Sequence, residues 1–315
     1  MPVHKQTKKE YLLLFLKGAG MGAADVVPGV SGGTIAFITG IYTRLLNAIQ
    51  SINIQACKLL FDPSLKGSNV KAVWQHIDGN FLLAVFAGLI TSALSLAKII
   101  TYLIEQYPIL VWSFFFGLII ASFMHIAKQV NKWSVKTISS CLLGAIIAYV
   151  ITAISPAEAD PQWWFYTVSG AIAICAMILP GISGSFILLL LGMYGHVLTA
   201  INDLAFDLVG LFIIGCIMGL MVFSRVLTWL LARFHQLTFA LLAGFLLGSL
   251  NLLWPWKQVL TTYTNSHGII KPLSQQNISP ELFLQLTGQN PHLGAAIGFM
   301  FLGLALILFI ERLSK

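Results

Sequence analysis

The sequence PGVSGG at residues 28–33 recurs as PGISGS at residues 180–185, and each copy lies inside a long apolar segment. The two segments run from Tyr11 to Gln50 and from Trp163 to Ile201. Proline removes a backbone donor and disfavours helix at the residue before it, and glycine adds backbone freedom. We therefore expect a helix to end at each motif and a second helix to begin after it.

The two motifs belong to an internal repeat. With an offset of 152, residues 18–49 align with residues 170–201, and 13 of the 32 aligned positions are identical. Shared apolar composition alone would not place the Pro, Gly, Ser and Tyr residues in register. A second alignment, with an offset of 127, pairs Gly88 with Gly215, Gly117 with Gly244, Ser122 with Ser249, and Lys98 with Arg225. The offset changes because the hydrophilic loop 51–80 has no counterpart in the second half.

The composition indicates that lipid is the solvent of this chain. Of its 315 residues, 57% are apolar and only 9% are charged, whereas soluble domains carry about 25% charged residues. Apolar stretches of about 20 residues can cross a bilayer as helices. Six unbroken stretches of this kind occur: Phe81–Ile104, Ile109–Ala127, Thr137–Ile154, Asp207–Leu231, Leu237–Leu253 and Leu293–Ile310.

These features predict an all-α membrane protein made of two inverted repeats, each a re-entrant helical hairpin followed by three transmembrane helices. The first repeat covers residues 1–155, with hairpin 11–50, cytoplasmic loop 51–80 and spans in 81–154. The second covers residues 156–315, with hairpin 163–201, spans in 207–310 and outer loop 255–292. A hairpin returns to its own side and three spans do not, so the second repeat is inserted upside down. Two ordinary spanning helices joined by a tight turn are the alternative to each hairpin.

The distribution of charge supports this topology. The net charge is +7, and under the expected topology twelve Lys and Arg residues lie in cytoplasmic regions but only two in outer loops. Cytoplasmic loops of membrane proteins are enriched in cations in this way. We expect a multi-pass membrane protein with both termini in the cytoplasm. The cations form no basic aromatic face, so no nucleic acid partner is expected.

The two motifs are also the strongest candidate for a binding site. A helix that restarts at a break presents free backbone N–H groups and the positive end of its dipole, which together favour an anion such as phosphate. Small residues also allow tight helix packing, which is the alternative reading. The expected phosphate ligands are Ser31, Gly32, Gly33 and Thr34 at the first tip, and Ser183, Gly184 and Ser185 at the second.

Four charged residues within the apolar segments extend this prediction, because charge in a membrane is costly and usually functional. Lys98 and Arg225 are equivalent in the two repeats, and we expect them to receive an anionic headgroup on opposite sides. Arg44, whose repeat partner is His196, is expected to extend the anion path. Lys98, Arg225 and Arg44 could instead be interfacial anchors. Asp25 is the one carboxylate near a tip, and its interpretations are a coupling proton or a partner for a nearby cation on one side and a capping or water-solvated role on the other.

Catalytic and metal chemistry finds little support. No acidic pair has general acid/base spacing, and no P-loop pattern is present. The cysteines Cys57, Cys141, Cys175 and Cys216 lack metal-binding spacing. We therefore predict no metal, no cofactor and no catalytic residues. The sequence leaves open whether the protein works as a monomer or a homodimer.

The segments GAADVVPGVSGGTIAFITGIY (22–42) and GAIAICAMILPGISGSFILLLLGMY (170–194) resemble the bacterial polyprenyl-phosphate translocase family over essentially the whole chain. This resemblance implies a flippase that returns undecaprenyl phosphate from the outer to the cytoplasmic leaflet, with the carrier lipid as its partner. Membrane-embedded polyprenyl-diphosphate phosphatases share a Pro-Gly-x-Ser motif, but an arginine follows the serine there. Here glycine follows both serines, at Gly32 and Gly184, and no glutamate lies near. A small-anion channel or exchanger is the third alternative.

Overall fold

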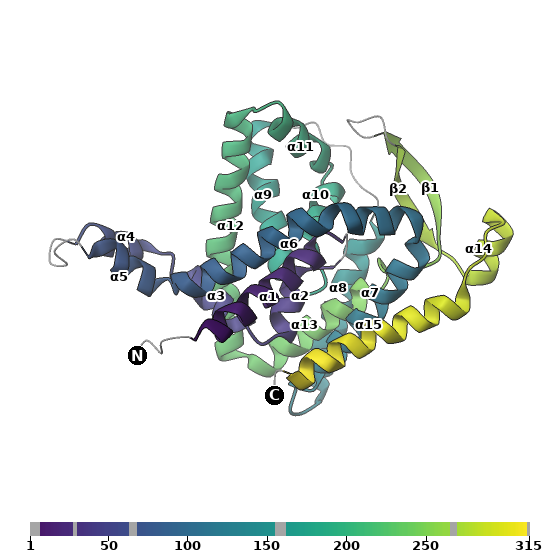
Figure 1. Ribbon diagram of the computed structural model, residues 1–315, viewed down its shortest axis with the longest axis horizontal. Helices are drawn as coiled ribbons and strands as arrows, with labels where there is room; N and C mark the ends of the chain where they lie inside the picture. The colour runs from purple at the N-terminus through teal and green to yellow at the C-terminus, as the bar shows by residue number, and fades with distance from the viewer. Residues whose placement is uncertain (1–6, 28–29, 63–67, 155–161, 265–269, 314–315) are drawn as a thin grey trace.

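A computed structural model describes residues 7–27, 30–62, 68–154, 162–264 and 270–313 (Figure 1). The described chain is mostly helical. Its first half contains the helices α1 (Lys8–Asp25), α2 (Gly32–Ile38), α3 (Tyr42–Gln50), α4 (Ile54–Leu60), α5 (Asn69–His76), α6 (Gly79–Gln106), α7 (Pro108–Ala127) and α8 (Val135–Ala153). Its second half contains α9 (Trp163–Ile178), α10 (Gly184–Leu190), α11 (Tyr194–Asn202), α12 (Phe206–Arg233), α13 (His235–Ser249), α14 (Pro280–Thr287) and α15 (Leu293–Leu313).

Each predicted break is present as a helix end. Helix α1 ends at Asp25 and α2 begins after the cap residue Ser31, whose side chain accepts a hydrogen bond from the Gly33 amide. Helix α9 ends at Ile178 and α10 begins after Ser183. Pro28 and Gly29 of the first motif lie outside the described residues. The two short helices that follow the breaks have identical lengths and register in the repeat alignment.

A second break in each broken segment was not predicted. It lies at Gly40 and at Gly192, where φ is +73° and +69°. This region of backbone space is favourable for glycine and strained for residues with a Cβ. Helices α10 and α11 are bent by 106° at this break and together count as one broken span or a re-entrant loop. Each broken segment therefore consists of three helices rather than two.

The long helices pack in pairs through glycine. Helix α1 packs on α6 and α9 on α12, whereas α7 packs on α15 and α8 on α13, which joins the two halves of the chain. A Cβ at Gly88 would collide with the carbonyl oxygen of Phe15, and a Cβ at the aligned Gly215 would collide with that of Thr167. Small residues that let two backbones approach are typical of membrane helix interfaces.

The chain is a multi-pass membrane protein. Among the residues that the structure describes, five helices are long and apolar enough to cross a bilayer, and the bent pair α10 and α11 raises the number to six. The predicted span Leu237–Leu253 forms only the 15-residue helix α13, followed by hydrogen-bonded turns at residues 250–253. The other five predicted spans match α6, α7, α8, α12 and α15 to within a few residues.

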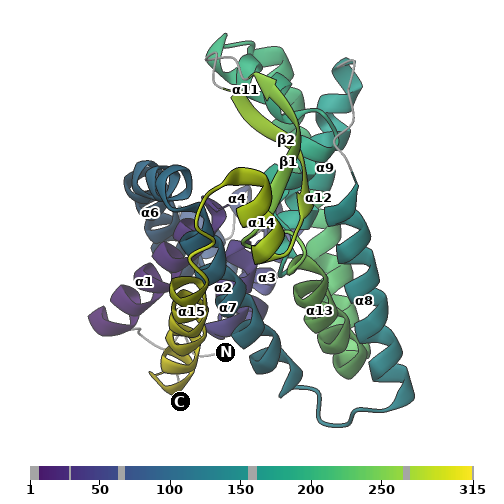
Figure 2. The ribbon, with the colours of Figure 1, turned by 90° about the vertical axis from the view of Figure 1, so that its right-hand side faces the viewer.

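The prediction of an all-α chain is wrong in the loop 255–292. Strands β1 (Lys257–Thr264) and β2 (Ile270–Asn277) pair antiparallel there, with Lys257 opposite Asn277. The first strand, KQVLTTYT, is rich in β-branched and aromatic residues, which favour a pleated strand. The loop 51–80 also contains helices, α4 and α5. The start of α1 and the end of α15 lie on the opposite side of the molecule from the β hairpin (Figures 1 and 2).

Candidate functional site

The tips of the two broken segments touch each other. Ser31 Oγ donates a hydrogen bond to the carbonyl oxygen of Met177 (2.8 Å), and the Tyr42 hydroxyl donates to that of Ile178 (3.1 Å). The Gly181 amide donates to Thr34 Oγ1 at 3.1 Å. In each bond a side chain of the first segment meets the backbone of the second. The structure thus brings together the tips of the two segments, whose bonded residues lie 136 to 147 positions apart in the chain.

The amide donors of the first tip already have acceptors. The Gly32 amide donates to Asp25 Oδ1 at 2.6 Å, and the Gly33 amide donates to Ser31 Oγ at 3.0 Å. Ser31 and Thr34 are fully buried. Asp25 Oδ2 is also buried, and no described residue forms a hydrogen bond with it. Asp25 therefore caps the first tip, and a carboxylate occupies the position that the sequence assigned to a phosphate.

The second tip is built from the same motif but lacks such acceptors. Ser183 and Ser185 share a hydrogen bond between their hydroxyl oxygens at 2.8 Å. Within the described chain, no hydrogen-bond acceptor meets the amides of Gly184, Ser185 or Phe186. Ser183 is buried and Ser185 is exposed. Of the two tips, the second one presents free donors for an anion.

The second tip is seated on α13 through its glycine. Gly181 has φ of +88°, a conformation that residues with a Cβ rarely adopt. A Cβ there would lie 3.0 Å from Ser249 Oγ and 3.1 Å from the carbonyl oxygen of Phe245. The glycine of this motif thus meets both a backbone need and a packing need.

The predicted cations are not gathered at the tips. Lys98 lies on an exposed face of α6 and Arg225 on an exposed face of α12, and neither has a hydrogen bond or ion pair with a described residue. Arg44 forms a two-pronged ion pair with Asp78, with Nε–Oδ2 at 2.7 Å and Nη2–Oδ1 at 3.1 Å. Its guanidinium lies 4.3 Å from the centre of the Phe81 ring. Its repeat partner His196 is half-buried on α11.

Two residues near the tips were missed by the sequence analysis. Lys17, half-buried on α1, donates from Nζ to the carbonyl oxygen of Thr39 at 2.7 Å. Tyr42, which is buried, ties the two tips together. A lysine within an apolar helix was a usable signal for Lys17. The alignment of Tyr42 with Tyr194 marked that position but gave no role, because the contact depends on the other half of the chain.

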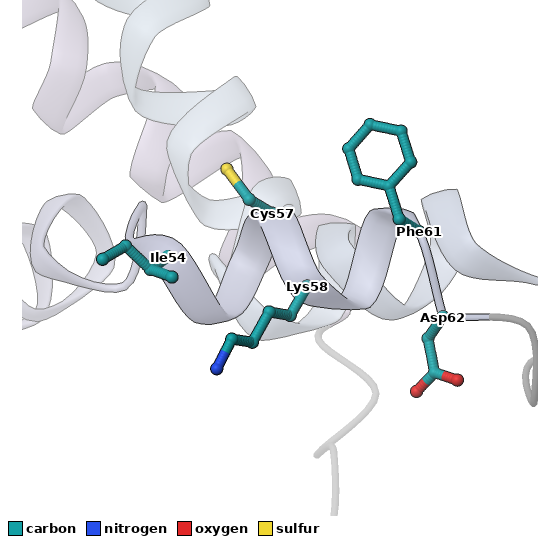
Figure 3. A pocket seen from close by; sticks show the side chains of 5 residues that line it. All are labelled: Ile54, Cys57, Lys58, Phe61 and Asp62. Atoms are coloured by element: carbon teal, nitrogen blue, oxygen red, sulfur yellow. The ribbon is translucent and has the colours of Figure 1, made fainter.

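Other candidate sites lie apart from the tips. A pocket on α4 is lined by Ile54, Cys57, Lys58, Phe61 and Asp62, with Cys57 and Phe61 on one side of the helix and the two charged residues on the other (Figure 3). Helix α4 lies at the edge of the molecule, away from α2 and α10 (Figure 1). Among the described residues, no group of three His, Cys, Asp or Glu side chains could hold a metal ion.

Comparison with known proteins gives a consistent family. The chain matches the undecaprenyl phosphate translocase-like family over residues 21–271. It is 47% identical over 305 residues to the polyprenyl-phosphate transporter of Vibrio cholerae, and this alignment covers 97% of each chain. It is 33% identical over 258 residues to the polyprenyl-phosphate transporter of Staphylococcus aureus, covering 76% of this chain and 85% of that one. No solved structure matches. The resemblance carried by the doubled motif is therefore confirmed, and the chain belongs to the undecaprenyl phosphate translocase-like family.

Proposed function

We propose that this protein transports a polyprenyl phosphate between the two leaflets of the bacterial inner membrane. The observation that carries the proposal is the 47% identity, over 97% of both chains, to a relative named as a polyprenyl-phosphate transporter. The geometry agrees, because a lipid with a phosphate head needs polar donors inside an apolar bundle, and the two tips supply them. Both relatives are named as transporters rather than enzymes.

The headgroup site in this proposal lies where the two tips meet. The free amides of Gly184 and Ser185, with the hydroxyls of Ser183 and Ser185, form its initial donors. At the first tip, the hydroxyls of Ser31 and Thr34 become available when their bonds to the second tip break, whereas the amides of Gly32 and Gly33 stay capped by Asp25 and Ser31. Backbone N–H groups bind phosphate at helix starts in many proteins, and their attraction is strong where water is excluded. Both tips come from one chain, so this site needs no second copy of the protein.

The direction of transport and the membrane orientation belong to the same proposal. We place both termini in the cytoplasm and the β hairpin outside, which makes the two repeats inverted with respect to each other. In this orientation the headgroup of undecaprenyl phosphate enters from the outer leaflet and leaves toward the cytoplasmic one by alternating access. Lys98 and Arg225 attract it from the lipid-exposed faces of α6 and α12, and Arg44 extends the path. Asp25 carries the coupling proton.

Reconstitution tests this function directly. Purified protein in liposomes should move a fluorescent polyprenyl phosphate from one leaflet to the other, without releasing inorganic phosphate and without conducting chloride. The double variant Ser183→Ala/Ser185→Ala should reduce transport at least tenfold, because two hydroxyl donors and acceptors are lost from the second tip. Ser95→Ala is the matched control, since Ser95 is exposed on α6 and bonds only within its own helix. Phosphate release by the wild type would point to a phosphatase, and chloride flux without lipid movement to a channel.

A further inference from the structure

Two charged residues of α1 hold α2 at its two ends. Asp25 Oδ1 accepts a hydrogen bond from the amide of Gly32, the first residue of α2, at 2.6 Å. Lys17 Nζ donates to the carbonyl oxygen of Thr39, the residue that ends α2, at 2.7 Å. The carboxylate thus lies at the positive end of the helix dipole and the ammonium at the negative end, which is the stabilising arrangement at both ends.

The second hairpin has no such pair. The positions that align with Lys17 and Asp25 are Ser169 and Met177. The Ser169 hydroxyl donates within its own helix, to the carbonyl oxygen of Tyr166. The side chain of Met177 is apolar and carries no charge to place at the start of α10. Two segments with the same backbone plan therefore differ in the charges at both ends of their short helix.

The packing of the two short helices differs in the same sense. Six of the seven residues of α2 are buried, and the helix packs against α1, α3, α7 and α9. Three of the seven residues of α10 are buried, and its main packing partners are α9 and α11. Segments with few buried contacts and unsatisfied backbone groups open more easily than well-packed ones.

We infer that Lys17 and Asp25 are positioning residues that hold α2 fixed, and that the second hairpin is the part of the site that moves during transport. The link between this motion and transport rests on the proposed function. The difference in mobility between the two hairpins does not depend on that function. The three hydrogen bonds between the tips are the contacts that this motion would break. Each of them takes a side chain from the fixed hairpin and a backbone group from the moving one.

Hydrogen–deuterium exchange in nanodiscs tests the inference on the whole protein. Amides of residues 32–38 should exchange more slowly than those of residues 184–190. Lys17→Met should raise exchange in α2 by at least about fivefold, because one end of its dipole loses its partner, and leave α10 unchanged. Asp25→Asn should act in the same direction. Lys17→Arg should restore protection, since the cation is retained, whereas a residue that mattered only through its apolar stem would tolerate Met.

Two further measurements complete the test. Ser169→Ala, at the position equivalent to Lys17, is the matched control and should leave α2 exchange unchanged. Undecaprenyl phosphate added to the nanodisc should slow exchange in α10 and not in α2. Equal exchange of the two helices in the wild type, or unchanged α2 exchange in Lys17→Met, would overturn the inference. A third outcome is that α2 is protected and responds to Lys17→Met, but the protein moves no lipid phosphate. This outcome would support the positioning role of Lys17 and Asp25 and overturn the proposed function.

Discussion

Thr34 and Gly181 join the two halves of this protein through one hydrogen bond, in which the Gly181 amide donates to Thr34 Oγ1 at 3.1 Å. Thr34 belongs to the first turn of α2, and Gly181 lies in the break before α10. Both groups are buried. The bond has no mirror image in the described chain, since Phe186, the residue aligned with Thr34, has no hydroxyl. The contact between the tips is therefore asymmetric although the motifs are nearly identical.

Thr34→Val should lower the free energy of unfolding, although the side chain keeps nearly the same shape. The variant leaves the buried Gly181 amide without its acceptor, which costs about 1–3 kcal/mol of unfolding free energy. Thermal unfolding in detergent measures the loss, and the transport assay should show slower lipid movement. Thr34→Ser keeps the hydroxyl and should remain close to the wild type. Equal stability of the Val and wild-type proteins would show that the amide finds another partner.

The glycine contacts between the two halves give a second prediction. A Cβ at Gly117 would collide with the carbonyl oxygen of Met300, and one at Gly244 with that of Cys141. Gly117→Ala and Gly244→Ala should each force a helix pair apart and cost about 1–3 kcal/mol. Gly298→Ala is the matched control, because nothing lies within 4 Å of a Cβ there. Alanine is the better helix former, so this control should be neutral or more stable by up to about 1 kcal/mol.

The sequence predicted those parts of the structure that depend on local chemistry. Proline, glycine and serine mark the breaks at residues 26–31 and 179–183, and hydropathy marks the long helices. The breaks at Gly40 and Gly192 were missed because an isolated glycine in an apolar segment is compatible with a continuing helix. The β hairpin was not predicted because the polarity of residues 255–292 indicates a loop outside the membrane and does not reveal the strands within it.

The phosphate-binding role of the motif residues stays a prediction, and their arrangement could not be predicted from the sequence. Of the predicted ligands, Ser31 and Thr34 lie at the contact between the two tips, whereas the Ser183 hydroxyl bonds to that of Ser185 within its own tip. That Asp25 caps Gly32 could not be derived, because it depends on how α1 and α2 pack against each other. That Arg44 pairs with Asp78 depends on residues 34 positions apart meeting at the start of α6. The spacing of these residues in the sequence does not reveal either contact.

The ion pair between Arg44 and Asp78 allows a test of the two interpretations of Arg44, as part of the phosphate path or as an interfacial anchor. Asp78 has φ of +53°, which Asn tolerates better than most residues, so Asp78→Asn removes the charge with little backbone strain. Both side chains are more than a third exposed, and an exposed pair contributes only about 0–1 kcal/mol. If Arg44 extends the phosphate path, Arg44→Gln should slow transport severalfold while Asp78→Asn should not. Equal loss of transport in the two variants would mean that Arg44 acts through Asp78.

Lys257, at the start of β1, gives a prediction on pH. Its ammonium lies 4.5 Å from the centre of the Trp112 ring and donates to the carbonyl oxygen of Leu252. Burial lowers the pKa of Lys257 from its ordinary value to about 8. Between pH about 8 and about 10.4 the unfolded chain keeps a proton that the folded protein has lost. The contribution of Lys257 to the free energy of unfolding therefore rises with pH across that window. Below pH about 8 the cost of burying the ammonium is fully present.

Lys257→Met removes the titrating group and keeps an apolar stem. The unfolding temperature of the wild type in detergent should rise relative to that of Lys257→Met as the pH is raised from 7.5 to 9.5. Lys71→Met, at an exposed lysine of α5, is the control, and its difference from the wild type should stay constant over the same range. A constant difference for Lys257→Met as well would show that the ammonium stays protonated, held by the Trp112 ring and the Leu252 carbonyl strongly enough to offset its burial.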